Sequence, residues 1–218
     1  MTKINQTCPE LMIETWVQGG PLTLADLHGK VVLVEVIQVN CPGCFVNGLP
    51  EAIRLYQKYN DQGLEVIALA TAFEDYDKNT LENLQRLIDT GEVIGETSSF
   101  MEERGLLKDG KLMWEIPFPV AMDSVAEDDR PVDDNRVLTT AQQHLPDFDT
   151  RREEEKTFTL RLVRQYLEHK KMRANTFELF SLKGTPSSIL IDREGILRDV
   201  SFGLADHLEP KIQKYLRG

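Results

Sequence analysis

The sequence predicts an α/β protein in which helices flank a mixed central β-sheet. Two almost continuously apolar runs, 31–39 and 64–70, enclose a segment whose apolar residues have helical spacing. The strands of such a strand–helix–strand unit pair in parallel. Near the C-terminus, the runs 187–191 and 196–200 flank Asp192-Arg193-Glu194-Gly195, which is typical of an antiparallel hairpin. A sheet that contains both kinds of pair is mixed.

The composition is that of a globular protein, and the charge argues against some partners. The 218 residues are 41% hydrophobic and 28% charged, which is enough for a sizeable core without disulfides or metals. Lys and Arg number 25 and Asp and Glu 36, so the net charge is −11. We therefore expect no nucleic-acid partner and no membrane partner.

The same sequence carries an expectation about location. No apolar run reaches the roughly 18 residues of a membrane span. The first ten residues contain no apolar signal-peptide core. We expect the chain as given to be cytoplasmic, and periplasmic if a leader has been removed.

The strand–helix–strand unit contains the most informative motif of the chain. Its first strand, 31–39, leads directly into Cys41-Pro42-Gly43-Cys44. The helix that follows extends to about Asn60, and Pro50 within it predicts a bend. The strand 64–70 completes the unit.

Three further elements are predicted outside this unit and the hairpin. A helix begins after Asn79 or Thr80, either of which can cap it. The run 118–123 is a short strand whose proline, Pro119, suits a strand start or a sheet edge. An amphipathic helix at 208–216 closes the chain.

The sequence becomes more polar between residues 124 and 175. The acidic runs around Asp128 and Asp133 predict a solvated surface, and an apolar stripe from 158 to 167 has helical spacing. We expect a mainly helical insertion at 124–175 within a single domain that spans residues 1–218. The stripe most simply packs back on the domain. An exposed stripe would instead form the face of a homodimer or of another partner.

Cys41 and Cys44 form a Cys-x-x-Cys pair where a strand ends and a helix begins. The free N–H groups of a helix N-terminus stabilise a thiolate on Cys41. Cys44 lies in the same turn, so it can attack a mixed disulfide formed on Cys41. Pro42 stiffens the turn, and Gly43 permits close approach of a substrate. The pair therefore predicts two-step thiol–disulfide exchange with Cys41 as nucleophile and Cys44 as resolving thiol.

A metal site is the alternative for such a pair, and the sequence disfavours it. Zinc needs four ligands, and the sequence has no second Cys-x-x-Cys and only scattered histidines, at His28, His144, His169 and His207. We expect no metal and no bound cofactor beyond the redox-active cysteine pair. The remaining thiol, Cys8, is expected to be packed in the core.

Glu35 interrupts the apolar strand six residues before Cys41. One interpretation is a buried carboxyl group with a raised pKa that accepts the proton of Cys44. The other is a side chain that reaches solvent or pairs with Lys30 or Lys58. The sequence leaves both open.

Four segments carry a family resemblance: Leu27-His28-Gly29-Lys30-Val31-Val32-Leu33-Val34, Asn40-Cys41-Pro42-Gly43-Cys44, Phe118-Pro119-Val120-Ala121-Met122-Asp123, and the run from Gly184-Thr185-Pro186 to Gly195. Together they resemble the thioredoxin superfamily, and within it the TlpA-like and AhpC/TSA-like redoxins. The resemblance covers about residues 10–123 and 176–218. It implies a thioredoxin-like fold with the insertion placed before the strand that follows the family's cis-proline.

The resemblance also implies roles for particular residues. Pro186 corresponds to the cis-proline that faces the two active-site cysteines, and Thr185 to the residue whose backbone pairs with bound substrate. Glu35 falls where thioredoxins carry a buried carboxylate. Two positions depart from the family: Asn40 replaces the usual tryptophan, which would alter the substrate surface, and the dipeptide between the cysteines is Pro-Gly rather than Gly-Pro.

Three classes of function follow from these residues. The leading one is a thiol–disulfide oxidoreductase that acts on protein disulfides and receives electrons from a dithiol donor such as a thioredoxin-type reductase. The second is an antioxidant thiol peroxidase, although Gln38 and Val34 stand where peroxiredoxins need Thr or Ser and Pro. The third is a redox-inert interaction module in which the insertion binds the partner.

Overall fold

The computed structural model describes residues 2–217, which form two compact units. The first unit consists of the chain up to Val125 and from Ala174 onward, and the second is Ala126–Arg173. The second unit lies within the region 124–175 that was expected to be inserted. Within residues 2–217, no helix combines the length and the apolar character needed to cross a membrane.

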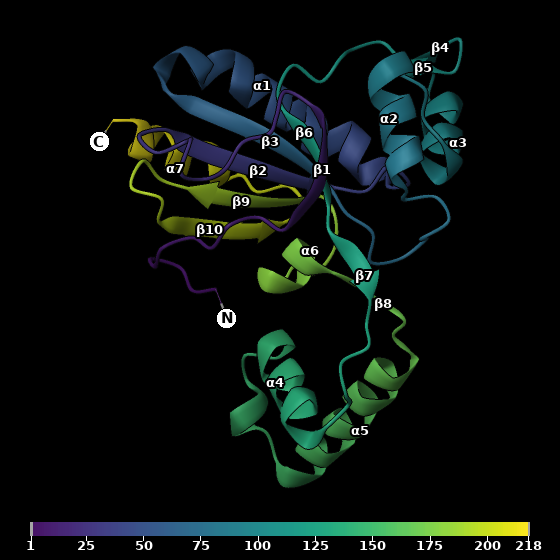
Figure 1. Ribbon diagram of the computed structural model, residues 1–218, viewed down its shortest axis with the longest axis vertical. Helices are drawn as coiled ribbons and strands as arrows, with labels where there is room; N and C mark the ends of the chain where they lie inside the picture. The colour runs from purple at the N-terminus through teal and green to yellow at the C-terminus, as the bar shows by residue number, and fades with distance from the viewer. Residues whose placement is uncertain (1, 218) are drawn as a thin grey trace. The chain divides into compact units, whose positions relative to one another are not determined.

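A six-stranded mixed sheet forms the centre of the first unit (Figure 1). Its strand order is β1-β6-β3-β2-β9-β10. The strands are β1 (Ile13–Gln18), β2 (Val31–Ile37), β3 (Leu64–Ala70), β6 (Val120–Asp123), β9 (Ser187–Ile191) and β10 (Leu197–Phe202). The pairs β2–β3 and β3–β6 are parallel, and the pairs β1–β6, β2–β9 and β9–β10 are antiparallel. The predicted mixed sheet is confirmed.

Helices and short segments cover both faces of this sheet. The elements are η1 (Cys44–Gly48), α1 (Leu49–Tyr59), η2 (Asn60–Gln62), α2 (Leu81–Thr90), α3 (Gly95–Glu103), β4 (Leu107–Lys108), β5 (Lys111–Leu112), α6 (Asn175–Leu179) and α7 (Leu208–Leu216). Of the two predicted caps, Thr80 is the N-cap of α2, since its hydroxyl accepts a hydrogen bond from the Asn83 N–H.

The central strand β2 contributes to two separate hydrophobic cores. Successive side chains of a strand point to opposite faces. Val31, Leu33 and Ile37 therefore pack with apolar residues of α1, α2 and α7. Val32, Val34 and Val36 pack on the other face with a cluster that includes Cys8, Leu27, Phe180 and Leu182. Glu35 shares its face with Leu33 and Ile37, which places its carboxyl group toward the helix that begins at the cysteines.

The two predicted strand boundaries beside the site move inward. β2 ends at Ile37 rather than at residue 39: the Ile37 carbonyl still accepts the Thr71 N–H at the end of the pairing with β3, and the chain then turns into the cysteine motif. β6 begins at Val120, after Pro119, and it lies between β1 and β3. The proline therefore marks a strand start and not a sheet edge.

The expected bend at Pro50 takes the form of a π-helical turn. Residues 44–48 adopt this wider turn, and the Leu49 N–H bonds to the carbonyl of Cys44. Pro50 has no N–H, and its ring would clash with the carbonyl four residues earlier in a regular helix. The wider turn relieves this clash and places Pro50 in the first turn of α1.

The second unit is helical and contains α4 (Asp134–His144), η3 (Phe148–Thr150) and α5 (Glu153–His169). A two-stranded sheet of β7 (Val125–Glu127) and β8 (Met172–Ala174) joins its two ends. The apolar stripe divides in the structure. Leu167 is buried, whereas Phe158, Leu162 and Tyr166 are 48–58% exposed.

The expectation of a solvated acidic surface was wrong for Asp128. Its side chain is only 1% exposed, and its carboxylate accepts hydrogen bonds from Arg130 at 2.7 Å and from Arg136 at 2.5 Å. Burial raises the pKa of Asp128, but the two guanidinium groups outweigh burial and lower it to about 2. Asp133 instead caps α4, where it accepts the N–H of Arg136.

Candidate active site

The cysteine pair lies at the C-terminal end of β2. Cys41 follows the strand and is partly exposed, and Cys44 begins the π-helical turn and is fully buried. The Cys44 N–H donates to the Cys41 carbonyl at 3.0 Å. Both side chains are free thiols, so the structure shows the dithiol form.

The environment of the pair separates the acidities of the two thiols. The hydrogen bond with Cys44 lowers the pKa of Cys41 to about 6 against the opposing effect of burial, helped by the Thr185 side chain and by backbone N–H groups of the turn. Burial, followed by the interaction with Cys41, raises the pKa of Cys44 well above its usual value. A thiolate near neutral pH therefore forms on Cys41 and not on Cys44.

The loop that precedes β9 packs directly against the cysteine turn. Thr185 and Pro186 are joined by a cis peptide bond, and the Cys41 thiol lies 3.5 Å from the Thr185 carbonyl oxygen. A β-carbon built on Gly43 would lie 3.5 Å from Pro186 Cδ and 3.9 Å from Cys41 Sγ. Thr185 and Pro186 thus lie where the family resemblance places them.

The Glu35 carboxyl group is buried beneath this turn. Glu35 is 3% exposed, and its Oε2 accepts a 2.8 Å hydrogen bond from the hydroxyl of Ser188, its neighbour on β9. Burial raises the pKa of Glu35 to about 8, although the bond from Ser188 opposes the rise. This acidity suits a group that exchanges a proton near neutral pH.

The alternative interpretation of Glu35 was wrong. Lys30 pairs with Glu65 at 2.7 Å, and Lys58 pairs with Glu209 at 2.8 Å. The buried position also leaves Glu35 no route to solvent as a strand-end side chain.

Gly48 belongs to the site, although it was not among the site residues predicted from the sequence. A β-carbon at this position would lie 2.5 Å from Glu35 Oε1 and 2.6 Å from Pro186 Cβ. Only glycine lets the π-helical turn pass this close to both residues. A glycine within a helical pattern was the available signal.

Asn40 is buried and forms side-chain hydrogen bonds to two other segments, and it is not part of an exposed surface. Asn40 is 7% exposed. Its side-chain Nδ2 donates to Asp75 at 2.7 Å, and its side-chain Oδ1 accepts the Glu96 N–H at 2.8 Å. It therefore ties the loop after β3 and the start of α3 to the cysteine turn. Whether it also alters substrate binding stays a prediction.

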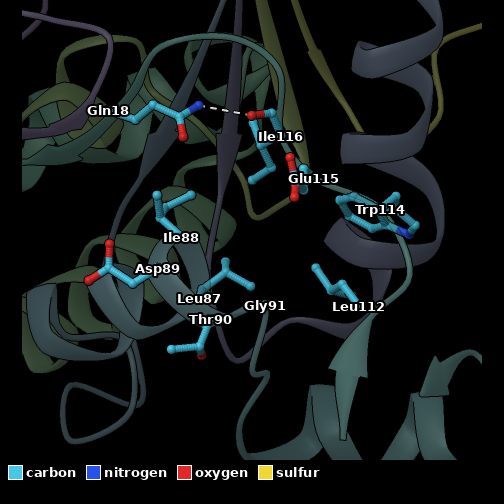
Figure 2. A pocket seen from close by; sticks show the side chains of 10 residues that line it. All are labelled: Gln18, Leu87, Ile88, Asp89, Thr90, Gly91, Leu112, Trp114, Glu115 and Ile116. Carbon is cyan, nitrogen blue, oxygen red and sulfur yellow. Dashed lines mark hydrogen bonds between the residues drawn. The ribbon is translucent and has the colours of Figure 1, made fainter. Parts of the chain in front are cut away.

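Other features of the described chain do not extend the cysteine site. Within residues 2–217, no group of three or more His, Cys, Asp or Glu side chains could hold a metal ion. A separate pocket of about 210 Å³ lies between the end of α2 and the segment 112–116. Figure 2 shows its lining side chains and the hydrogen bond that Gln18 donates to the Ile116 carbonyl. Its lining includes Trp114 and neither active-site cysteine.

Comparison with solved structures places the fold. The crystal structure of a thioredoxin-like superfamily protein shares 25% identity, with 97% of each chain covered and a TM-score of 0.58. A thiol-disulfide isomerase from Corynebacterium glutamicum shares 27% identity over 98% of this chain and 97% of its own, with a TM-score of 0.59. The fold is thioredoxin-like.

The sequence comparisons are partial. No family model matches the chain. Protein DipZ of Mycobacterium tuberculosis is 34% identical over 88 residues, which are 37% of this chain and 12% of DipZ. A probable phospholipid hydroperoxide glutathione peroxidase of Helianthus annuus is 40% identical over 52 residues, which are 24% of this chain and 28% of the peroxidase. The chain thus matches only a small part of these curated relatives.

Proposed function

The chain belongs to the thioredoxin superfamily, and we propose that it is a thiol–disulfide oxidoreductase that exchanges protein disulfides through Cys41 and Cys44. One observation carries the proposal. A partly exposed thiol with a lowered pKa lies beside a buried thiol with a raised pKa, against the cis-peptide loop at Pro186. This asymmetry suits one thiol to attack and the other to resolve.

The proposed exchange has two steps. The Cys41 thiolate attacks a substrate disulfide, forms a mixed disulfide with one substrate sulfur, and releases the other as a thiolate. Cys44 then loses its proton to the Glu35 carboxylate and attacks Cys41 Sγ, which releases the second substrate thiolate. Two electrons pass to the substrate, and a Cys41–Cys44 disulfide remains.

A donor must reduce that disulfide before the next turnover. We propose another protein's dithiol, such as that of a thioredoxin-type reductase, with no cofactor bound to this chain. The proposed location is the cytoplasm, with the periplasm as the alternative. A second copy of this chain, bound through the insertion, is a further proposed partner.

Trapping the intermediate tests the proposal. Cys44→Ser removes the resolving thiol, so a mixed disulfide on Cys41 should accumulate when a disulfide-bonded protein substrate is added, as read by intact mass without reductant. Cys8→Ser is the matched control, because Cys8 is buried in the opposite core and its pKa is raised to about 12 by burial. Absence of the mixed disulfide in Cys44→Ser would exclude the mechanism.

A thiol peroxidase is the second candidate, favoured by the match to the sunflower peroxidase over 52 residues. A low pKa on Cys41 also suits attack on a peroxide oxygen. Consumption of a lipid hydroperoxide by wild type but not by Cys41→Ser, in the presence of a dithiol reductant, would support this activity.

A further inference from the structure

Gln38 is a buried polar residue directly after β2, and both the N–H and the carbonyl group of its side chain form hydrogen bonds. It is 2% exposed. Its Nε2 donates to the Glu74 carbonyl at 3.3 Å, and its Oε1 accepts a 3.1 Å hydrogen bond from Thr185 Oγ1. The Glu74 carbonyl also receives a shorter bond, 2.9 Å, from the Asn79 amide. The contact with Thr185 is therefore the one that Gln38 alone provides.

The Thr185 hydroxyl stands among three acceptors. It donates to Gln38 Oε1 at 3.1 Å, and donation from the same side chain to the active-site sulfurs lowers the pKa of Cys41 and of Cys44. A hydroxyl has one proton to donate. In the dithiol form that proton points to Gln38, while the Cys41 thiol donates to the Thr185 carbonyl at 3.5 Å.

We propose that Gln38 is a positioning residue whose side-chain carbonyl competes with the active-site sulfurs for the one proton of the Thr185 hydroxyl. When Cys41 ionises, its thiolate gains this donor only if the hydroxyl turns away from Gln38. Gln38 therefore favours the neutral thiol and moderates the acidity of Cys41. The inference deepens the proposed function and rests on it for its meaning in exchange.

The competition determines whether each substitution raises or lowers the pKa of Cys41. Gln38→Met has a similar length and only a weak acceptor, so the hydroxyl becomes free to donate to the thiolate and the pKa of Cys41 falls. Thr185→Val removes the hydroxyl and keeps the backbone carbonyl, so the pKa of Cys41 rises. One net hydrogen bond corresponds to a shift of roughly 0.5–1 pKa unit.

The experiment measures the pKa of Cys41 from the pH dependence of its alkylation rate in the reduced protein. Wild type, Gln38→Met, Thr185→Val and the double variant form a cycle. We expect Gln38→Met to lower the pKa in the wild-type background and to leave it unchanged in the Thr185→Val background. An unchanged or raised pKa in Gln38→Met, or an equal fall in both backgrounds, would overturn the proposal.

Asn79→Ala is the matched control for loosening of the loop. It removes the other donor to the Glu74 carbonyl and the acceptor of the Asn40 N–H beside Cys41, and it leaves the contact between Gln38 and Thr185 in place. If it lowers the pKa of Cys41 as much as Gln38→Met does, loop mobility and not proton competition explains the shift.

A second replacement covers the case in which Gln38→Met does not fold. Gln38→Glu keeps an acceptor of the same reach and adds negative charge, so the pKa of Cys41 should rise, and a fall contradicts the proposal. These measurements need no substrate. A failure of Cys44→Ser to form a mixed disulfide would remove the proposed function and leave the acidity result standing.

Discussion

At the scale of single residues, the site shifts the pKa values of Cys41, Cys44 and Glu35 in different directions. Cys41 is shifted down to a pKa of about 6, and Glu35 up to about 8, while Cys44 is shifted up by burial and by its partner. A single cause would have moved all three groups in one direction. Hydrogen bonds dominate at Cys41, and desolvation dominates at the two buried groups.

The raised pKa of Glu35 predicts that this residue lowers the stability of the fold. Its folded pKa of about 8 exceeds the usual 4.5, so the folded state retains a proton that the unfolded state releases. Stability contributed by this group therefore falls as the pH rises from about 4.5 to 8. At pH 7, Glu35→Gln should raise the free energy of unfolding by roughly 3 kcal/mol.

Urea titrations of wild type and Glu35→Gln at pH 5 and pH 7.5 check this expectation. The gain should be several-fold larger at pH 7.5. A gain that is equal at both pH values would mean that Glu35 has an ordinary pKa in the folded protein.

At the scale of elements, the π-helical turn brings α1, β2 and the cis-peptide loop together. At its last residue, Gly48, a β-carbon would lie 2.5 Å from Glu35 Oε1 and 2.6 Å from Pro186 Cβ. At the end of β6, the Asp123 carboxylate accepts hydrogen bonds from the Thr71 hydroxyl at 2.8 Å and from the Thr176 N–H of α6 at 2.8 Å. Buried polar contacts therefore tie the ends of the parallel strands to the helices beside the site.

Substitution by alanine should destabilise the fold at one glycine of the cysteine turn and not at another. Gly48→Ala would place a β-carbon 2.5 Å from the Glu35 carboxyl oxygen, and such crowding should cost roughly 1–3 kcal/mol of unfolding free energy. Gly43→Ala meets only ordinary contacts at 3.5 Å and beyond. Gly43 has helical dihedral angles, so alanine there should be neutral or stabilising.

Thermal or urea unfolding of the two alanine variants gives the comparison. Equal stability of Gly48→Ala and Gly43→Ala would show that the turn has space at Gly48 and that its packing against Glu35 is loose.

At the scale of the whole molecule, the exposed stripe of α5 bears on the proposed homodimer. Antiparallel pairing of two α5 helices about Leu162 would set Phe158 opposite Tyr166 of the second copy, and Glu155 opposite His169. The stripe is thus self-complementary in apolar character. One 17-residue helix, about 25 Å long, offers less than the ~800 Å² per partner of stable complexes, so we expect a weak dimer.

Sedimentation equilibrium over a range of protein concentrations tests this arrangement. Wild type should shift toward a dimer as the concentration rises, and Leu162→Glu should remain monomeric. Leu204→Glu, at a leucine that is 66% exposed in the first unit, should behave as wild type. A wild-type chain that stays monomeric at high concentration, or a dimer retained in Leu162→Glu, would contradict the arrangement.

The elements that the sequence predicted well are those specified by local patterns. β-branched apolar runs define β2 and β3, and a charged turn that ends in a single glycine defines the hairpin of β9 and β10. The edge strand β1 was missed because its six residues are only partly buried and carry a weak pattern. Helix α4 was not predicted individually, because short polar runs conceal its apolar positions.

Local patterns were enough to predict the parallel unit of β2 and β3, the hairpin of β9 and β10, and the cysteine pair at a strand end, since each depends on segments that lie close together along the chain. The three-dimensional contacts were needed to show that Glu35 is buried against Gly48, that Asp128 is paired with two arginines, and that Gln38 contacts Thr185, 147 residues away. Burial and the partner of a polar group depend on segments brought together by folding, and no local pattern encodes them.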